Sequence, residues 1–433
     1  MSRSSTKPLT FIDAFAGCGG LSLGLMQAGL TGRFAIERDK FAFATLKANL
    51  IAKGSPYKYV WPRWLPKEPI GIVELLCNYR DQLEKISGSV DVLVGGPPCQ
   101  GFSAAGRRQH DDPRNQLFAS YLNLVDIIKP KAVLIENVRG FTLDFSTGDE
   151  IKNFSQALKE RLSDAYTVHE QLLDLSTFGV PQARTRYFVL AFLSELDVPD
   201  PFAHLQYRLP SFLRSLRLTV PVSSGTAISD LEIGRNGTRP STESKGFEET
   251  CYAGPLTHYQ KLMNAGCDVP TDLRLARHAE NIAGRFKEII ELSHAEGRLN
   301  TSIGAEMRAR FGLKKMALRV LDPDRPSPTI TSMPDDLLHY SEPRTLTVRE
   351  NARLQSFPDW YSFQGKYTTG GHRRKQEVPR FTQVANAVPP LVARAIGETL
   401  TELLGSKQAA STASDNEMRS RLHSIQQGTE ICA

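Results

Sequence analysis

Cys99 is the residue of this 433-residue sequence whose surroundings most clearly suggest chemistry. A short apolar run, Val92 to Val94, ends at two glycines, and two prolines then precede the cysteine. Each proline fixes φ at about −65° and lacks an N–H group, so a buried strand is expected to end here and to present an exposed thiol. A small, buried, structural cysteine is the alternative, but the Gly-Phe-Ser-Ala-Ala-Gly sequence after Gln100 is typical of a loop.

Three charged side chains could act beside this thiol. Glu136 lies near the end of an apolar run over 131–138, and a strand there, parallel to the Cys99 strand, would place both groups on one rim of a sheet. Arg184 and Arg186 lie two residues apart in an expected strand, so they share a face and need an anionic or carbonyl partner. The alternative for all three is an ordinary structural ion pair.

A second candidate site begins at the glycine-rich turn Ala16 to Gly20. It lies between an expected strand over 9–15 and an expected helix over 21–28, and glycines let the backbone approach a ligand closely. Glu37 ends the next expected strand, at a spacing that suits a carboxylate bound to ribose hydroxyls. The pattern is not a full G-x-G-x-x-G, so a nucleoside without phosphates fits better than a dinucleotide, and a turn without any ligand is the alternative.

Alternating strand and helix patterns position these residues as far as about residue 195, after which the chain is richer in Pro, Ser and Gly. We expect a loop insertion over 51–69, helices over 74–86, 117–128 and 151–162, short helices over 273–292, a strand over 329–331, a capped helix over 347–357 and a last helix over 391–404.

Composition limits the class of protein. The length favours two lobes, and six scattered cysteines without a C-x-x-C pair favour a reducing compartment and no structural zinc or other metal site. Met1 to Thr10 is polar, and no run of 18 apolar residues occurs, so we expect no membrane contact and a cytoplasmic protein, associated with the nucleoid in a prokaryote.

The net charge of +6 permits a nucleic-acid partner without requiring one. Basic residues gather after Cys99 and in two later segments, as expected of a surface that contacts phosphates, although ordinary solvated surfaces are the alternative. They are Arg107, Arg108, His110 and Arg114; Arg308, Arg310, Lys314, Lys315 and Arg319; and His372, Arg373, Arg374, Lys375 and Arg380.

Together these motifs resemble the DNA (cytosine-5) methyltransferase family over nearly the whole chain. The resemblance rests on five ordered motifs: Phe11 to Gly20, Pro97 to Gln100, Glu136 to Val138, Gln182 to Arg186, and Asn386 to Pro390. It implies an α/β fold in which a doubly wound, Rossmann-like, S-adenosylmethionine-dependent domain, 1–195 completed by 381–405, precedes a smaller target-recognition domain, 196–380. The tail, 406–433, is polar and expected to be disordered.

The resemblance also implies a reaction. Cys99 would add to C6 of a flipped-out cytosine in a specific double-stranded DNA sequence, with Glu136, Arg184 and Arg186 as its catalytic partners, and C5 would receive the methyl group. Burial should raise the pKa of Glu136. The expected contacts to S-adenosylmethionine are Phe15, Ala16, Gly17, Gly19, Gly20, Leu21, Glu37, Arg38, Pro98, Asn386 and Ala387.

Two positions depart from the family pattern. The acid that usually contacts the adenine, near Gly71 and Ile72 here, has no clear counterpart, and Glu74 is a poor substitute. The glycine that commonly precedes Asn386 is Ala385. The resemblance also suggests that a monomer acts alone on DNA, either with a separate cognate restriction endonuclease or as an orphan methylase.

Two rival functions stay open at this level. The tRNA-directed branch of the same family shares the catalytic motifs but typically has Cys-Phe-Thr in its small lobe, whereas Cys251 is followed by Tyr252. A non-catalytic DNA-binding or regulatory protein could keep the fold, although it would have no chemical reason to retain Cys99, Glu136 and Arg186 together.

Overall fold

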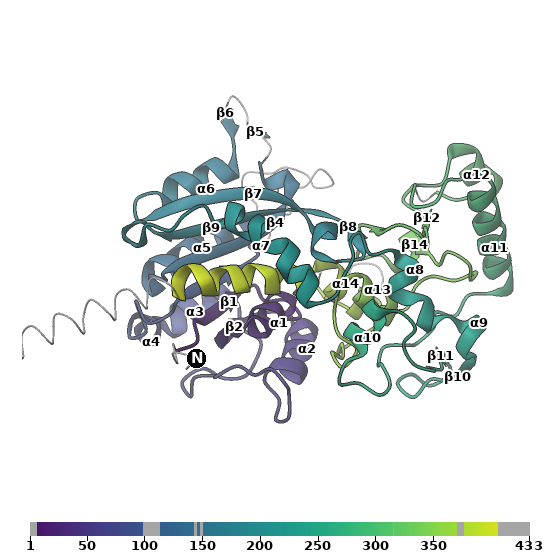
Figure 1. Cartoon of the computed structure of the whole chain (residues 1–433), viewed down its shortest axis with the longest axis horizontal. Helices are drawn as coiled ribbons and strands as arrows, with labels where there is room; N and C mark the ends of the chain where they lie inside the picture. Colours follow the sequence, from purple (N-terminus) through teal and green to yellow (C-terminus); the bar gives the residue numbers. More distant parts are fainter. Residues whose placement is uncertain are drawn as a thin grey trace, which may run out of the picture.

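A six-stranded sheet forms the centre of the large domain, in the strand order β2-β1-β3-β4-β9-β7 (Figure 1). The computed structural model describes residues 7–97, 113–142, 145–147, 150–314, 316–369 and 376–405. The strands of this sheet are β1 (Thr10–Ala14), β2 (Thr31–Ile36), β3 (Val92–Gly95), β4 (Ala132–Val138), β7 (Tyr166–Asp174) and β9 (Thr185–Leu193).

The first four strands of the sheet run parallel to one another. Gly95 of β3 pairs with Ile135 of β4, so the strand that ends at Pro97 and the strand that carries Glu136 reach the same rim. This confirms the parallel arrangement expected from the sequence. β9 is antiparallel to both β4 and β7, and β7 has no counterpart among the expected strands. Its half-exposed, largely polar sequence lacks the apolar run that marks the buried strands.

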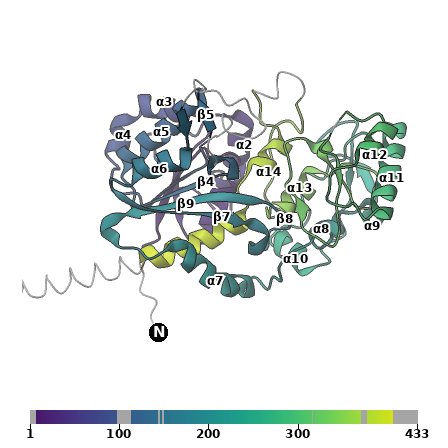
Figure 2. The same cartoon turned by 90° about the horizontal axis from the view of Figure 1, so that it is seen from above.

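Helices cover both faces of the sheet, which confirms the doubly wound α/β class (Figure 2). One face packs against α3 (Ile72–Asn78), α4 (Arg80–Glu84), α5 (Pro113–Ile128) and α6 (Phe154–Leu162). The other face packs against α1 (Gly20–Gln27), α2 (Lys40–Leu50), α7 (Pro201–Ser215) and the helix over 390–405.

The small domain lies beside the carboxyl ends of the parallel strands, on the right in Figure 1. Its helices are α8 (Ser224–Ile228), α9 (Ile233–Asn236), α10 (His258–Asn264), α11 (Glu280–Ala295), α12 (Ala305–Arg310) and α13 (Val348–Leu354), followed by α14 (Arg380–Asn386). Its strands are short pairs: β10 (Thr238–Pro240) with β11 (Glu248–Thr250), and β12 (Arg319–Val320) with β14 (Leu337–Leu338). α11, α12 and β12 have a small apolar core of their own.

The expected domain boundary near residue 195 stays a prediction, but α7 bears on it. α7 packs against β7, and its His204 and Arg208 form ion pairs with Glu402 of the last helix. The chain therefore stays with the large domain through α7, beyond residue 195.

Local sequence signals explain several element ends. Asp39 caps α2 by accepting hydrogen bonds from the N–H groups of Phe41 and Ala42. Thr347 and Glu350 form a capping box at the start of α13, as the sequence predicts for the helix over 347–357. The loop expected over 51–69 is confirmed, as no helix or strand occurs there.

Two expected elements are wrong in detail. The helix expected over 74–86 is two helices, because the backbone of Tyr79 leaves the helical region between α3 and α4. The strand expected over 329–331 is instead β13 (Ser327–Pro328), which pairs in parallel with β8 (Gln182–Ala183). Among the described residues, no helix is long and apolar enough to cross a membrane.

Candidate active site

A cavity of about 900 Å³ lies at the carboxyl ends of β1 to β4. Its walls come from three parts of the chain: the turn after β1, the ends of the neighbouring strands, and segments next to the small domain. Of the expected site residues, the following line it: Phe15, Ala16, Gly17, Leu21, Glu37, Arg38, Glu136, Arg184, Arg186, Asn386 and Ala387. The fold thus brings residues separated by more than 300 positions into one cavity.

The turn after β1 and the end of β2 are joined by Glu37. Its carboxylate accepts hydrogen bonds from the N–H of Gly17 (2.9 Å) and from the N–H of Asp39 (2.7 Å). Burial raises the pKa of Glu37 above its ordinary value, while these two N–H groups act in the opposite direction. Gly17 has a φ of 56°, and Phe15 also has a positive φ, so the turn is tightly shaped.

Gly19 and Gly20, both expected to contact the cofactor, do not line the cavity. They face the interior of the protein: a Cβ on Gly19 would lie 2.8 Å from the hydroxyl of Tyr361, and a Cβ on Gly20 would lie 2.4 Å from the carbonyl oxygen of Val388. Their lack of a side chain therefore serves close packing behind the turn, which the sequence alone could not distinguish from close approach to a ligand.

Glu136 and Arg186 form an ion pair in the wall of the cavity that β4 and β9 supply. The carboxylate oxygen lies 3.1 Å from Nε of Arg186, and both side chains are mostly buried, at 13% and 15% exposure. The antiparallel pairing of β9 with β4 sets this pair, because Arg186 lies opposite Val138, two residues beyond Glu136. An anionic partner for Arg186 was one of the two kinds expected.

Arg184 has the other expected kind of partner, a carbonyl. Its Nη1 donates to the carbonyl oxygen of Ala385 at 2.7 Å, and its Nε has no hydrogen-bond partner among the described residues. The side chain thus holds the segment that carries Asn386 and Ala387 against the cavity. Burial lowers the pKa of Arg184 to about 9.

Burial also shifts the pKa values of both members of the Glu136–Arg186 ion pair. It raises the pKa of Glu136, which Arg186 and Arg184 only partly offset, and it lowers the pKa of Arg186. The direction predicted for Glu136 is confirmed. A carboxyl group with a raised pKa can hold a proton for a base in the cavity.

Pro97 is the last described residue before Cys99. Its carbonyl oxygen accepts a hydrogen bond from Nδ2 of Asn137 at 3.1 Å, and Gly96 and Pro97 line the cavity beside Glu136. Asn137 was part of the Glu-Asn-Val motif, but its position in sequence gave no indication of this contact. Cys99 and Pro98 lie outside the described residues, as do Arg107, Arg108 and His110.

Several other lining residues had not been expected. Ile330 and Thr331 come from the small domain, and Ile70 to Glu74 come from the segment that leads into α3. No described strand lies near Gly71, and Glu74 lines the cavity as an exposed side chain. The family resemblance pointed to the neighbourhood of Gly71 and Ile72, whereas no sequence signal marked Ile330 and Thr331, because their place depends on long-range packing.

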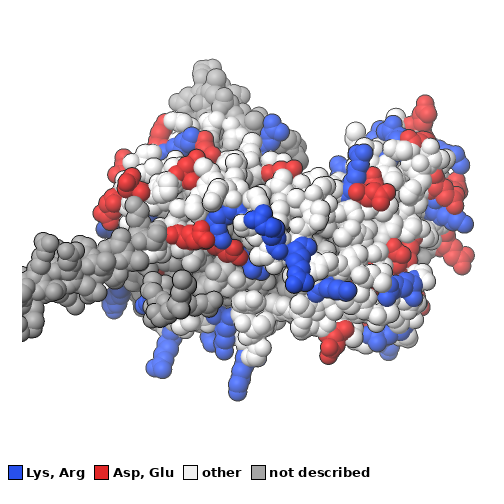
Figure 3. Space-filling model, viewed as in Figure 1, with Lys and Arg blue, Asp and Glu red and all other residues white. Residues whose placement is uncertain are grey.

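Some of the basic residues expected to contact phosphates form ion pairs with carboxylates. Arg380 forms ion pairs with Glu243 and Asp272, and Arg310 forms an ion pair with Glu288, so both are paired with carboxylates in this structure. Figure 3 shows Lys and Arg interspersed with Asp and Glu on one face of the small domain. Lys315 and 372–375 lie outside the described residues.

Comparison with known proteins decides the family. The family model for C-5 cytosine-specific DNA methylases matches residues 9–402, which include every motif described above. The chain belongs to the C-5 cytosine-specific DNA methylase family.

Individual methylases agree with this assignment. The chain is 32% identical to the type II methyltransferase M.DdeI of Desulfomicrobium norvegicum, over 91% of this chain and 88% of that protein. It is 31% identical to M.XorII of Xanthomonas oryzae pv. oryzae, over 93% and 86% of the two chains. A crystal structure of an E. coli prophage protein, described as a DNA modification methyltransferase, superposes with a TM-score of 0.62 at 25% identity and covers 92% of this chain and 99% of that one.

The protein is therefore an enzyme, a DNA (cytosine-5) methyltransferase, and the reading as a non-catalytic DNA-binding protein is wrong. It acts on DNA, and the type II methyltransferases among its relatives are consistent with a role in restriction and modification. Membership of this methylase family implies the general use of S-adenosylmethionine as methyl donor.

Proposed function

We propose that this methylase binds S-adenosylmethionine and a flipped-out cytosine in different parts of the cavity at the carboxyl ends of β1 to β4, with Cys99 as the nucleophile. The observation that carries the proposal is the shared cavity itself: Gly17 and Glu37, which follow β1 and β2, line it together with Pro97, Glu136 and Arg186, which follow β3 or lie on β4 and β9. A cytosine inside a duplex cannot reach such a cavity, so the base must leave the stack.

The cofactor end of the cavity suits a nucleoside with a sulfonium side chain. Glu37 supplies carboxylate oxygens for ribose hydroxyls, and Phe15, Ile36 and Ile72 supply apolar walls. Arg38, Asn386 and Ala387 line the same region. When bound there, S-adenosylmethionine supplies an electrophilic methyl group.

In the proposed methylation of cytosine, the chain's own residues activate the base and then release it. C5 of cytosine is a poor nucleophile, so the Cys99 thiolate adds to C6 and makes C5 enamine-like. Glu136 holds a proton at N3 of the base, which makes C6 more electrophilic, and Arg186 keeps the Glu136 carboxyl in place. Once C5 is methylated, a base takes the C5 proton, the electron pair of that C–H bond forms the C5–C6 double bond again, and Cys99 leaves C6 as a thiolate, so the ring regains its aromaticity.

The remaining parts of the proposal concern partners. The small domain, through the segment of roughly 200–315, would contact the target sequence in double-stranded DNA. We further propose that the enzyme acts as a monomer on DNA in the cytoplasm, with a cognate restriction endonuclease as a separate chain or as an orphan methylase.

Covalent trapping tests the nucleophile. DNA in which the target cytosine is 5-fluorocytosine should form a denaturation-resistant adduct with the wild-type enzyme, because fluorine at C5 cannot leave as a proton does. The Cys99→Ala variant should bind the same DNA without an adduct. An adduct in the variant would assign the nucleophile elsewhere, and no adduct with either protein would remove the covalent mechanism.

A further inference from the structure

The glycine turn Ala16 to Gly20 borders the cavity. A tyrosine far along the chain, Tyr361, contacts this turn on the side away from the cavity. Tyr361 donates its hydroxyl hydrogen to the carbonyl oxygen of Cys18, and its ring is fully buried. Gly19 packs directly on that hydroxyl. Gly17 and Cys18 line the cavity, so the hydroxyl of Tyr361 fixes a wall of the cavity from its far side.

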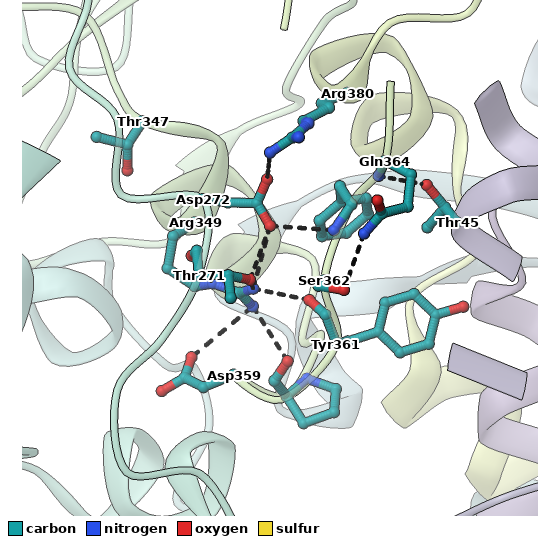
Figure 4. A network of polar contacts seen from close by, with 12 residues as sticks. Thr45, Thr271, Asp272, Thr347, Arg349, Asp359, Tyr361, Ser362, Gln364 and Arg380 are labelled. Atoms are coloured by element: carbon teal, nitrogen blue, oxygen red, sulfur yellow. Dashed lines mark hydrogen bonds and ion pairs between the residues drawn. The ribbon is translucent and has the colours of Figure 1, made fainter. Parts of the chain in front are cut away.

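Residues next to Tyr361 form hydrogen bonds with α2 of the large domain. Asn49 and Ser362 exchange two hydrogen bonds, from Nδ2 of Asn49 to the carbonyl of Ser362 (2.7 Å) and from the N–H of Ser362 to Oδ1 of Asn49 (2.9 Å). The N–H of Gln364 donates to the hydroxyl of Thr45 at 2.7 Å (Figure 4). Ser362 and Gln364 therefore fix this segment to α2 through their main-chain groups.

A single buried arginine ties this segment to the small domain. Arg349 donates to the carbonyl of Tyr361 (2.7 Å) and to the carbonyl of Thr271 (3.0 Å), and it lies 3.5 Å from the carboxylate of Asp272 (Figure 4). Asp272 in turn accepts a hydrogen bond from the N–H of Phe363 at 3.0 Å. The side chains of Arg349, Asp272 and Tyr361 are fully buried, where unpaired polar groups are costly, so these contacts hold one another's geometry.

We infer that Tyr361 is a positioning residue for the methyl-donor site, and that Arg349 sets the position of Tyr361 relative to the small domain. The inference rests on the proposed binding of S-adenosylmethionine in the cavity. Loss of the tyrosine hydroxyl leaves the buried carbonyl of Cys18 unpaired and frees the turn that carries Gly17. Cofactor affinity should fall, whereas the DNA-contacting surface of the small domain should be unaffected.

The chain offers a closely matched control in Tyr259. This tyrosine is also fully buried, and it also donates its hydroxyl hydrogen to a main-chain carbonyl, that of Arg353, at 2.6 Å. Its hydroxyl touches no part of the glycine turn. Tyr259→Phe thus removes a similar buried hydrogen bond but leaves the walls of the cavity unchanged.

The experiment measures binding of S-adenosylhomocysteine by calorimetry to the full-length wild-type enzyme, Tyr361→Phe and Tyr259→Phe. We expect Tyr361→Phe to raise the Kd about fivefold, the size of one buried hydrogen bond, and Tyr259→Phe to change it less than twofold. In methylation assays, Tyr361→Phe should raise the KM for S-adenosylmethionine and leave kcat at saturation unchanged. Equal affinity losses in both variants, or none in Tyr361→Phe, would overturn the inference.

Two further arms separate this inference from the proposed function. Failure of the wild-type enzyme to bind S-adenosylhomocysteine would overturn the proposed function itself, whereas wild-type binding with unaltered Tyr361→Phe binding overturns only the role of Tyr361. If Tyr361→Phe does not fold, Asn49→Ala loosens the same segment one residue away, and a folded Asn49→Ala enzyme with wild-type affinity would overturn the inference.

Discussion

At the scale of single residues, Glu136 is the group whose surroundings most change its chemistry. It lies in a mostly buried ion pair with Arg186, and burial raises the pKa of Glu136 despite that partner. Desolvation penalises both charges, so the pair is less strongly ionised than the same two groups in water. This is the state that a proton donor to cytosine N3 requires.

The pH dependence of catalysis follows from this shift. Because the active form of Glu136 is protonated, the rate should fall as the pH rises through its raised pKa in the complex. Glu136→Gln can still hydrogen-bond the base but cannot transfer a proton, so kcat should drop by about 10²- to 10⁴-fold and this alkaline limb should disappear. Single-turnover methylation rates across a range of pH measure both effects.

Glu170→Gln is a suitable control for that change. Glu170 is a carboxylate of the same sheet, paired with Lys159 and Tyr187 outside the cavity. Its removal should leave the pH profile as in the wild type. A Glu136→Gln enzyme with near wild-type kcat, or with the same alkaline limb, would contradict the proton-donor role.

At the scale of elements, the close crossing of α1 and the helix over 390–405 completes the large domain. A Cβ on Gly24 of α1 would lie 2.3 Å from the carbonyl oxygen of Pro390 and 2.4 Å from Cβ of Ala393. Gly24 therefore lets a segment from the end of the chain pack against the first helix. Ala387 and Val388, which come just before this helix in the sequence, line the cavity.

Substitution of Gly24 tests this crossing. Gly24→Ala should lower the free energy of unfolding by about 1–3 kcal/mol, because backbone atoms must move apart to admit the methyl group. Gly284, inside α11, has nothing within 4 Å of its added Cβ, so Gly284→Ala should stabilise the protein by up to about 1 kcal/mol. Urea unfolding of both variants measures the difference, and a neutral Gly24→Ala would refute the close crossing.

Sequence patterns predicted the elements around the site better than its walls. Buried strands such as β3 and β4 have continuous apolar runs, so their presence and parallel pairing could be predicted and are confirmed. β7 lacks such a run and was missed. Ile330 and Thr331 reach the cavity only through pairing of β13 with β8, a contact between segments about 145 residues apart in sequence, which no local pattern encodes.

At the scale of the whole molecule, the two domains share one continuous apolar core and a buried polar network. Residues of α1, the helix over 390–405, α10 and α13 belong to the same cluster, so the domains pack as one body around the cavity. Arg353 extends the polar network by pairing with Asp230 and Asp359, all of them fully buried. Such a scaffold can hold a cofactor and an extruded base in fixed relation.

The net charge of the whole molecule gives little attraction for DNA by itself. The excess of six positive charges is small for 433 residues, and Arg380 and Arg310 are already paired with carboxylates. Contacts to phosphates, which are common to all DNA sequences, position the enzyme without specifying a site. In the proposed function, base contacts made by the small domain supply the sequence specificity.

The most direct test of the central claim is methylation in a living host. The wild-type enzyme and Cys99→Ala should each be expressed in a strain without cytosine methylation, and the genomic DNA should be sequenced after bisulfite treatment. We predict protected cytosines within one recurring sequence for the wild type and none for Cys99→Ala. Fully converted DNA from a folded wild-type enzyme that binds S-adenosylhomocysteine, or equal protection by the variant, would contradict the claim.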